Sequence, residues 1–258
     1  MTVFVITGAS RGLGKSLALK NAGKGVSLGL VDIASEGLEE VAELCRSKGA
    51  TVLTNQIDVR NQEEIGGFIK RMICKFGEID YVFANAGVAS AFSENEYASF
   101  KIEVARDIMD TNYYGALNTF FPAIEHMLGV KRGHLIAISS ISSLAATHNS
   151  GSYSASKAAL SIWTDGLRLK LVHQNISVTN VILGFVDTPM IATFIHAQRL
   201  SISSELAAHQ IMLAVYKKKK IVSIPKLRNI PWYILRFTPV TVRQKILDWT
   251  WERIYHRT

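Results

Sequence analysis

Residues 3–14 read Val3-Phe4-Val5-Ile6-Thr7-Gly8-Ala9-Ser10-Arg11-Gly12-Leu13-Gly14. An apolar, β-branched run leads into a turn with three glycines, and residues 15–22 can continue as a helix. Glycine permits backbone angles and a close approach to a ligand that other side chains would block. The N-terminus of the following helix offers free N–H groups and a favourable dipole to an anion. The segment therefore predicts a strand, a phosphate-binding turn and a helix; the alternative is a glycine-rich turn without a ligand.

Strand and helix patterns alternate along the rest of the chain, which predicts an α/β fold. Runs such as residues 135–138 are apolar throughout, as in a parallel strand that is covered on both faces. We expect one domain with a doubly wound parallel seven-stranded sheet (Rossmann fold) and a ligand at the carboxyl ends of the strands. The predicted strands are 2–6, 26–31, 51–57, 80–84, 133–138, 176–182 and 220–224. The predicted helices are 12–22, 35–48, 61–76, 101–128, 152–173 and 203–216.

A second informative segment is Tyr153-Ser154-Ala155-Ser156-Lys157, which places a phenol and an ammonium one helical turn apart. A tyrosine with its ordinary pKa near ~10 is a poor proton shuttle at neutral pH, and a nearby lysine cation lowers that pKa. An acid–base group tuned toward neutral pH is what carbonyl reduction or alcohol oxidation requires. An isolated pair of this kind usually lies on a helix surface without a catalytic role. It therefore indicates catalysis only together with the other motifs of the chain.

Together these segments and others in the same order resemble the short-chain dehydrogenase/reductase family over about residues 1 to 225. The resemblance implies a nicotinamide cofactor and a catalytic set consisting of Asn112, Ser140, Tyr153 and Lys157. Ser140 is chosen over its neighbouring serines because it lies 13 residues before Tyr153, the spacing expected in the family. The implied cofactor-binding residues are Gly8, Ser10, Arg11, Gly12, Leu13, Gly14, Asp32, Asp58, Val59, Asn85, Ala86, Gly87, Tyr153, Lys157, Gly184, Val186 and Thr188.

The family mechanism assigns a role to each member of the catalytic set. Tyr153 exchanges the hydroxyl proton while a hydride passes between nicotinamide and an alcohol or ketone carbon. Lys157 lowers the pKa of Tyr153 and holds the nicotinamide ribose. Ser140 orients the substrate oxygen, and Asn112 fixes a water that links Lys157 to solvent.

Two residues bear on the choice between NAD(H) and NADP(H). Asp32 ends the second predicted strand, where a carboxylate accepts hydrogen bonds from ribose hydroxyls and repels a 2′-phosphate. Arg11 argues the other way, because a guanidinium suits a phosphate. The strand-end carboxylate usually outweighs an arginine in the glycine turn of this family, so the sequence favours NAD(H).

The substrate pocket follows from the resemblance and consists of Ser140, Leu144, Leu183, Phe185, Met190 and Phe194. Its members are mostly apolar, without a Lys or Arg to bind a carboxylate or phosphate, which favours a lipophilic alcohol or ketone. Residues 185–202 correspond to the family's substrate lid; the alternative is an ordinary packed helix. Leu183-Gly184 replaces the family's usual Pro-Gly, as in some of its membrane-associated hydroxysteroid dehydrogenases.

The positive charge of the chain is concentrated at its C-terminal end. Residues 1–214 hold 18 Lys and Arg against 19 Asp and Glu, whereas residues 215–258 hold 11 against 2. We therefore divide the chain into a catalytic domain, 1–225, and a basic aromatic C-terminal extension, 226–258. Because the catalytic domain is close to neutral, the pattern argues against a nucleic-acid-binding protein.

The C-terminal extension combines cations with aromatic side chains, and from about 241 to 255 its spacing fits an amphipathic helix. Tryptophan beside Lys and Arg is typical of the headgroup zone of a membrane. The hypothesis is peripheral membrane contact, which brings the enzyme to lipid substrates. The alternative is that the extension packs on the body or on a second subunit, since the family commonly forms homodimers or homotetramers through two long helices, here 101–128 and 152–173.

Cysteine spacing and hydropathy bear on metal binding, redox compartment and membrane insertion. Cys45 and Cys74 fit neither a metal site nor a disulfide, so we expect no metal and a reducing compartment. Met1 runs directly into the first strand, and no uncharged apolar run reaches the ~18 residues of a spanning helix. The expected location is the cytoplasm, with peripheral attachment to the inner face of a membrane.

Two other functions stay open at this point. A 3-oxoacyl-thioester reductase has the same catalytic set, and the basic extension offers a docking surface for an acidic carrier protein. A non-catalytic nucleotide-binding sensor or scaffold is compatible with the fold, because fold does not fix function. The complete catalytic set argues against this last reading, since a protein that only binds a nucleotide does not need it.

Overall fold

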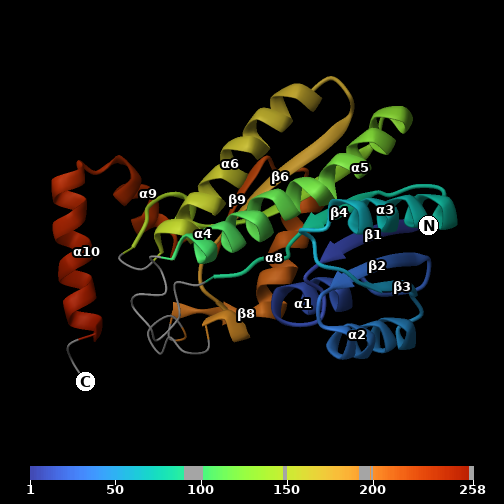
Figure 1. The fold of residues 1–258 in the computed structure, drawn as a ribbon, viewed down its shortest axis with the longest axis horizontal. Coiled ribbons are helices and arrows are strands. Elements are labelled where there is room, and N and C mark those ends of the chain that lie inside the picture. The colour runs from blue at the N-terminus through green and yellow to red at the C-terminus, as the bar shows by residue number, and fades with distance from the viewer. Residues whose placement is uncertain (90–100, 148–149, 192–197, 199, 256–258) are drawn as a thin grey trace.

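The computed structural model describes residues 1–89, 101–147, 150–191, 198 and 200–255, the last six of them by their backbone alone. Seven parallel strands form one sheet in the order β3-β2-β1-β4-β5-β6-β9 (Figure 1). These strands are β1 Thr2–Thr7, β2 Val26–Asp32, β3 Thr51–Gln56, β4 Tyr81–Ala84, β5 Gly133–Ser140, β6 Ile176–Leu183 and β9 Ile221–Ile224. The predicted doubly wound Rossmann fold is confirmed, and the ends of each strand lie within two residues of their predicted positions.

Helices cover both faces of the sheet. The helices of one face are α1 Gly12–Asn21, α2 Ser35–Ser47 and α8 Ser204–Tyr216, and those of the other are α3 Gln62–Phe76, α5 Gly115–Val130 and α6 Gly151–Leu171. Alternate residues of β1 enter the two cores: Phe4 and Ile6 pack with α1, α2 and α8, whereas Val3 and Val5 pack with α3, α5 and α6. This double burial explains why the strand has no polar residue in its interior.

The predicted helix 101–128 is wrong in one respect. It is divided into α4 Ile102–Met109, a π-helical turn Asp110–Tyr114 and α5. Asn112 lies in that turn, and its side chain exchanges two hydrogen bonds with the backbone of Val88, at 2.8 and 2.9 Å. The widened turn directs this side chain toward the segment after β4, and π-helical turns of this kind are frequent at functional sites.

The sheet has its topological switch point between β1 and β4, because the chain builds outward through β2 and β3 before it returns to β4. Ligands of open α/β sheets bind outside the carboxyl ends of the strands at such a point. Beside this edge two short strands that were not predicted, β7 Val186–Asp187 and β8 Ile202–Ser203, pair with each other.

The C-terminal extension forms α9 Ile230–Phe237 and α10 Val240–Tyr255, which includes the predicted helix 241–255. Both helices lie on the side of the molecule where the strands end (Figure 1). Among the described residues, no helix is both long and apolar enough to cross a membrane.

Candidate active site

The glycine turn closes directly onto the end of β4. Gly8 and Gly12 have φ angles of 66° and 53°, a conformation that favours glycine. A Cβ atom on Gly14 would lie 1.9 Å from the carbonyl oxygen of Gly8, so a side chain there has no room. The turn therefore brings backbone N–H groups close together at the N-terminus of α1, as an anion site requires.

Thr7 and Asn85 tie the ends of β1 and β4 together. The Thr7 hydroxyl accepts hydrogen bonds from the backbone N–H groups of Asn85 and Ala86, both at 3.1 Å. The Asn85 amide donates to the carbonyl oxygens of Thr7 at 2.9 Å and Gly8 at 3.1 Å. These bonds fix the glycine turn relative to the switch point.

Asp32 is held rigidly at the end of β2. One of its carboxylate oxygens accepts the backbone N–H of Ser10 at 2.9 Å, and the other accepts that of Ala34 at 3.0 Å. The carboxylate thus joins the glycine turn to the segment after β2 and lines the cavity beside Ile33.

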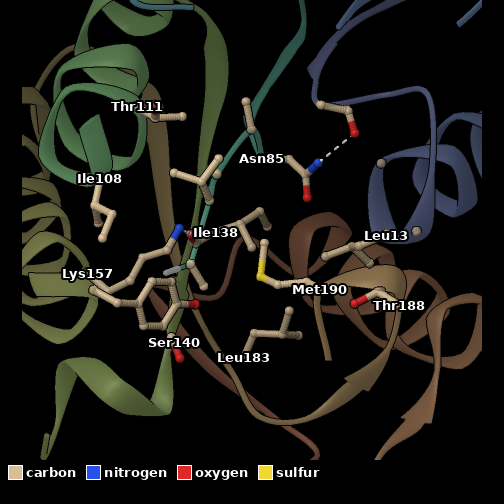
Figure 2. A pocket seen from close by; sticks show the side chains of 18 of the residues that line it. Leu13, Asn85, Ile108, Thr111, Ile138, Ser140, Lys157, Leu183, Thr188 and Met190 are labelled. Atoms are coloured by element: carbon tan, nitrogen blue, oxygen red, sulfur yellow. Dashed lines mark hydrogen bonds between the residues drawn. The ribbon is translucent and has the colours of Figure 1, made fainter. Parts of the chain in front are cut away.

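A cavity of about 820 Å³ extends along the carboxyl ends of the strands. Its lining reaches from Asp32 after β2 to Gly184 after β6, which spans four interstrand gaps, or roughly 19 Å. The predicted residues that line it are Gly8, Arg11, Gly12, Leu13, Gly14, Asp32, Asp58, Val59, Asn85, Ala86, Gly87, Ser140, Tyr153, Lys157, Leu183, Gly184, Phe185, Val186, Thr188 and Met190. Ser140 and Lys157 lie on one side of this space and Leu13 and Thr188 on the other (Figure 2). A long, bipartite molecule such as a dinucleotide fits this arrangement.

Four predicted site residues do not line the described cavity. Ser10 is buried and contributes its backbone N–H to Asp32, while its hydroxyl has no hydrogen-bond partner among the described residues. Asn112 is buried behind the wall, where its amide also donates to Ser156 at 3.0 Å. Leu144 follows a short 3₁₀ turn that carries it away from the lining. Phe194 lies outside the described residues.

Lys157 is a buried cation at the floor of the cavity. Only 5% of it is exposed, and its Nζ donates a 2.9 Å hydrogen bond to the carbonyl oxygen of Ile138 on β5. Burial disfavours the charged form and lowers the pKa of Lys157 to about 8. A Cβ atom on Gly87 would lie 3.3 Å from this nitrogen, so glycine leaves the space beside it open.

Tyr153 differs from expectation in the direction of its pKa. Burial raises the pKa of the Tyr153 phenol, and a hydrogen bond with Ser140 opposes that rise only in part. Lys157 Nζ lies 5.9 Å from the centre of the ring. The predicted lowering by Lys157 is therefore not the net effect, because desolvation outweighs the hydrogen bond with Ser140.

The neighbouring serines are engaged elsewhere. The Ser139 hydroxyl donates to the Lys157 carbonyl at 3.1 Å and pairs with Ser161 at 2.7 Å, so it faces α6. The Ser143 hydroxyl donates to the Ser140 carbonyl at 2.6 Å. Among these serines, Ser140 is the one whose hydroxyl bonds Tyr153.

Comparison with known proteins identifies the family. Residues 2–199 match the model of the short chain dehydrogenase family. The chain therefore belongs to the short-chain dehydrogenase/reductase family, and it is an oxidoreductase of that family. An uncharacterized oxidoreductase of Staphylococcus saprophyticus is 37% identical over 191 residues, which cover 73% of this chain and 80% of that relative.

Two further relatives of this family member have more specific names. An 11-beta-hydroxysteroid dehydrogenase-like protein of Arabidopsis thaliana is 36% identical, and the match covers 73% of this chain and 60% of that protein. A fatty acyl-CoA reductase of Acinetobacter baylyi is 32% identical, with 84% and 74% covered.

Solved structures share the fold of this family member. A short chain dehydrogenase of Mycobacterium paratuberculosis bound to NAD has a TM-score of 0.77 at 23% identity, and the match covers 86% of this chain and 95% of that one. Carveol dehydrogenase of Mycobacterium avium in complex with NAD has a TM-score of 0.79 at 22% identity, with the same coverage.

Some residues of the site were not predicted. Ile33 is exposed at the cavity edge next to Asp32, and a large apolar residue directly after a strand-end carboxylate is the signal that indicates it. Arg60 also lines the cavity, and it is paired with Asp58 at 2.6 Å and Asp107 at 3.1 Å. The described residues contain no group of three or more potential metal ligands.

Proposed function

We propose that this oxidoreductase transfers a hydride between NAD(H) and a lipophilic alcohol or ketone. The observation that carries the proposal is one cavity with the glycine turn at one side and Ser140, Tyr153 and Lys157 at the other. The test is the change in nicotinamide absorbance when purified protein is mixed with the dinucleotide and a panel of secondary alcohols and ketones. Absence of turnover across the panel, despite tight dinucleotide binding, would favour the sensor or scaffold alternative.

In this proposal the side chains of the protein carry out the proton transfer that accompanies hydride transfer. Nicotinamide, when bound, supplies or accepts the hydride. Ser140 holds the substrate oxygen next to the Tyr153 hydroxyl, which gives its proton in reduction and takes one in oxidation. Lys157, with a pKa near 8, carries its positive charge at neutral pH and favours the phenolate as that proton leaves. Asn112 fixes the segment after β4 through Val88.

The preference for NAD(H) over NADP(H) rests on charge at the end of β2. Both carboxylate oxygens of Asp32 accept hydrogen bonds from backbone N–H groups. These bonds hold the carboxylate where it can meet the adenosine ribose of a bound dinucleotide. It would repel a 2′-phosphate. Arg60, the second guanidinium in the lining, is already paired with two carboxylates, which leaves Arg11 as the residue that argues for a phosphate.

The substrate class is inferred from the apolar wall beside the catalytic residues. Leu183, Phe185, Met190 and Ile191 line it. Two relatives are named for steroid and fatty acyl substrates, in keeping with an apolar pocket. The name of the Acinetobacter protein indicates a thioester substrate, which is in keeping with the second candidate, reduction of the keto group of a 3-oxoacyl thioester. Comparing turnover of acyl thioesters and of free ketones at equal concentration separates the two.

An assembly of two or four identical subunits is also proposed. The outer faces of α5 and α6 expose apolar side chains, including Phe121, Ile162 and Leu169. Apolar faces on two neighbouring helices fit a self-complementary interface. Sedimentation equilibrium of the purified protein gives the subunit number.

Membrane contact through the C-terminal extension is the last part of the proposal. Ile230, Ile234 and Phe237 follow one another at intervals of four and three residues, so they share one face of α9, and Leu227 precedes the helix. All four are exposed, Ile234 by 63% and Phe237 by 82%. The surrounding net positive charge suits anionic lipid headgroups, at the inner face of a membrane on the cytoplasmic side.

A further inference from the structure

Asn229, the residue before α9, is buried at the carboxyl end of the sheet. Only 2% of it is exposed. Its amide nitrogen donates hydrogen bonds to the carbonyl oxygen of Ile182 on β6, at 3.3 Å, and to the hydroxyl of Ser223 on β9, at 2.9 Å. One side chain from the C-terminal extension therefore joins the last two strands of the sheet.

The same side chain lies directly behind the cavity wall. A Cβ atom on Gly184 would lie 2.4 Å from the Asn229 amide oxygen, so the amide occupies the space of the missing side chain. Gly184 lines the cavity, whereas Asn229 is not among its lining residues. The Gly184 backbone N–H also donates to the Ile224 carbonyl at 2.7 Å. Asn229 thus contacts the reverse side of the wall that faces the ligand.

Arg228 supports the same wall from its other end. One of its guanidinium nitrogens donates to the carbonyl oxygens of Leu200, at 2.8 Å, and Ser201, at 2.9 Å. The next residues form β8, which pairs with β7, and the Ile202 N–H donates to the Phe185 carbonyl at 3.2 Å. Two consecutive residues therefore hold both the end of β6 and the strand that pairs with β7.

We propose that Arg228 and Asn229 are positioning residues that fix the wall formed by residues 183–188 against the nicotinamide half of the cofactor. The role rests on the proposed dinucleotide function. It gives the C-terminal extension a part in the cofactor site, although the extension contributes no residue to the cavity lining described here. It also accounts for glycine at position 184, because any side chain there meets the Asn229 amide.

A double-mutant cycle tests this contact. NADH binding is measured by fluorescence titration for the wild type, Gly184→Ala, Asn229→Ala and the combined variant, together with the melting temperature of each. Asn229→Ala is expected to weaken NADH binding several-fold. Gly184→Ala is expected to weaken it on the order of tenfold in the wild-type background and by less than about twofold in the Asn229→Ala background, because truncation of Asn229 makes room for the methyl group.

The outcomes separate this role from the proposed function. Equal losses for Gly184→Ala in both backgrounds would contradict the positioning role. So would an Asn229→Ala variant that melts earlier but binds NADH as the wild type does, since a purely structural residue behaves in that way. A wild-type protein that binds neither NADH nor NADPH contradicts the proposed function and this role with it.

Arg228 has a matched control within the same C-terminal extension. Arg228→Ala is expected to weaken NADH binding several-fold. Arg236→Ala, which removes an exposed cation of α9, is expected to leave it unchanged. Equal effects of the two substitutions would show that net charge, and not the bonds to Leu200 and Ser201, explains the result, and would contradict the role of Arg228.

Discussion

The Nζ atom of Lys157 lies 5.9 Å from the centre of the Tyr153 ring and donates its hydrogen bond to the Ile138 carbonyl of β5. The cation is thus anchored to the sheet and not to the phenol. In this position the cation can favour the phenolate only through its charge.

Replacement of Tyr153 by Phe removes the proposed proton donor and little else. We expect turnover to fall by at least about a hundredfold, because positioned acid–base catalysis contributes on that order. NADH binding should change less than about threefold. Tyr216→Phe is the control, since this hydroxyl bonds Asn21 instead of the site. Near-normal turnover of Tyr153→Phe would remove Tyr153 from the mechanism.

The depressed pKa of Lys157 predicts a pH dependence of stability. In the folded protein the pKa is about 8, against an ordinary value of 10.5. Between these values the unfolded chain binds more protons, so the free energy of unfolding rises with pH across this window. Relative to a Lys157→Met variant, wild-type protein without cofactor should therefore gain roughly 3 kcal/mol from pH 8 to pH 10.5.

Urea unfolding at several pH values measures that gain. Lys170→Met, which removes an exposed lysine of the same helix, is the control and should show no such trend. A constant difference between wild type and Lys157→Met over the whole range would mean that Lys157 is not desolvated in solution.

Asp32→Asn tests the charge at the end of β2. The substitution keeps a similar shape but removes the repulsion of a 2′-phosphate. We expect the ratio of the NADPH and NADH dissociation constants to fall about tenfold, a change of about 1.4 kcal/mol. Glu43→Gln removes an exposed charge of α2 and should leave the ratio unchanged. An unaltered ratio in Asp32→Asn would assign cofactor choice to other residues.

The exposed face of α9 predicts binding to anionic phospholipid vesicles. Wild-type protein should co-sediment with them at low salt and less at high salt, because headgroup attraction is screened. Phe237→Asp should reduce binding about tenfold or more through loss of one buried aromatic side chain. Leu44→Asp on α2 introduces the same charge elsewhere and should have a smaller effect. No co-sedimentation of the wild type at low salt rules out this contact.

The sheet and the glycine turn were predictable from the sequence because their signals are local. A parallel strand that is buried on both faces is an unbroken apolar run. Residues 3–6 of β1 form such a run just before the first glycine. The π-helical turn at Asp110–Tyr114 was not predictable, since it depends on the bonds between Asn112 and Val88, which lie 24 residues apart.

Parts of the site escaped prediction for the same reason. Asn229 contacts Gly184 across 45 residues of sequence, and neither position shows a periodic pattern that indicates the other. The direction of the Tyr153 pKa also depends on tertiary burial, whereas the sequence shows only the neighbouring lysine. Sequence motifs therefore predicted most residues of the cavity lining. The pKa of Tyr153 and the support from Asn229 depend on tertiary packing.

The most direct test of the central claim is a fluorescence titration of the purified wild-type protein with NADH and, separately, with NADPH. The cavity and the fixed Asp32 carboxylate predict saturable binding of both, with NADH at least about tenfold tighter. Tighter binding of NADPH would contradict the cofactor preference and point to Arg11. Binding of neither would contradict the account of a nicotinamide-dependent oxidoreductase.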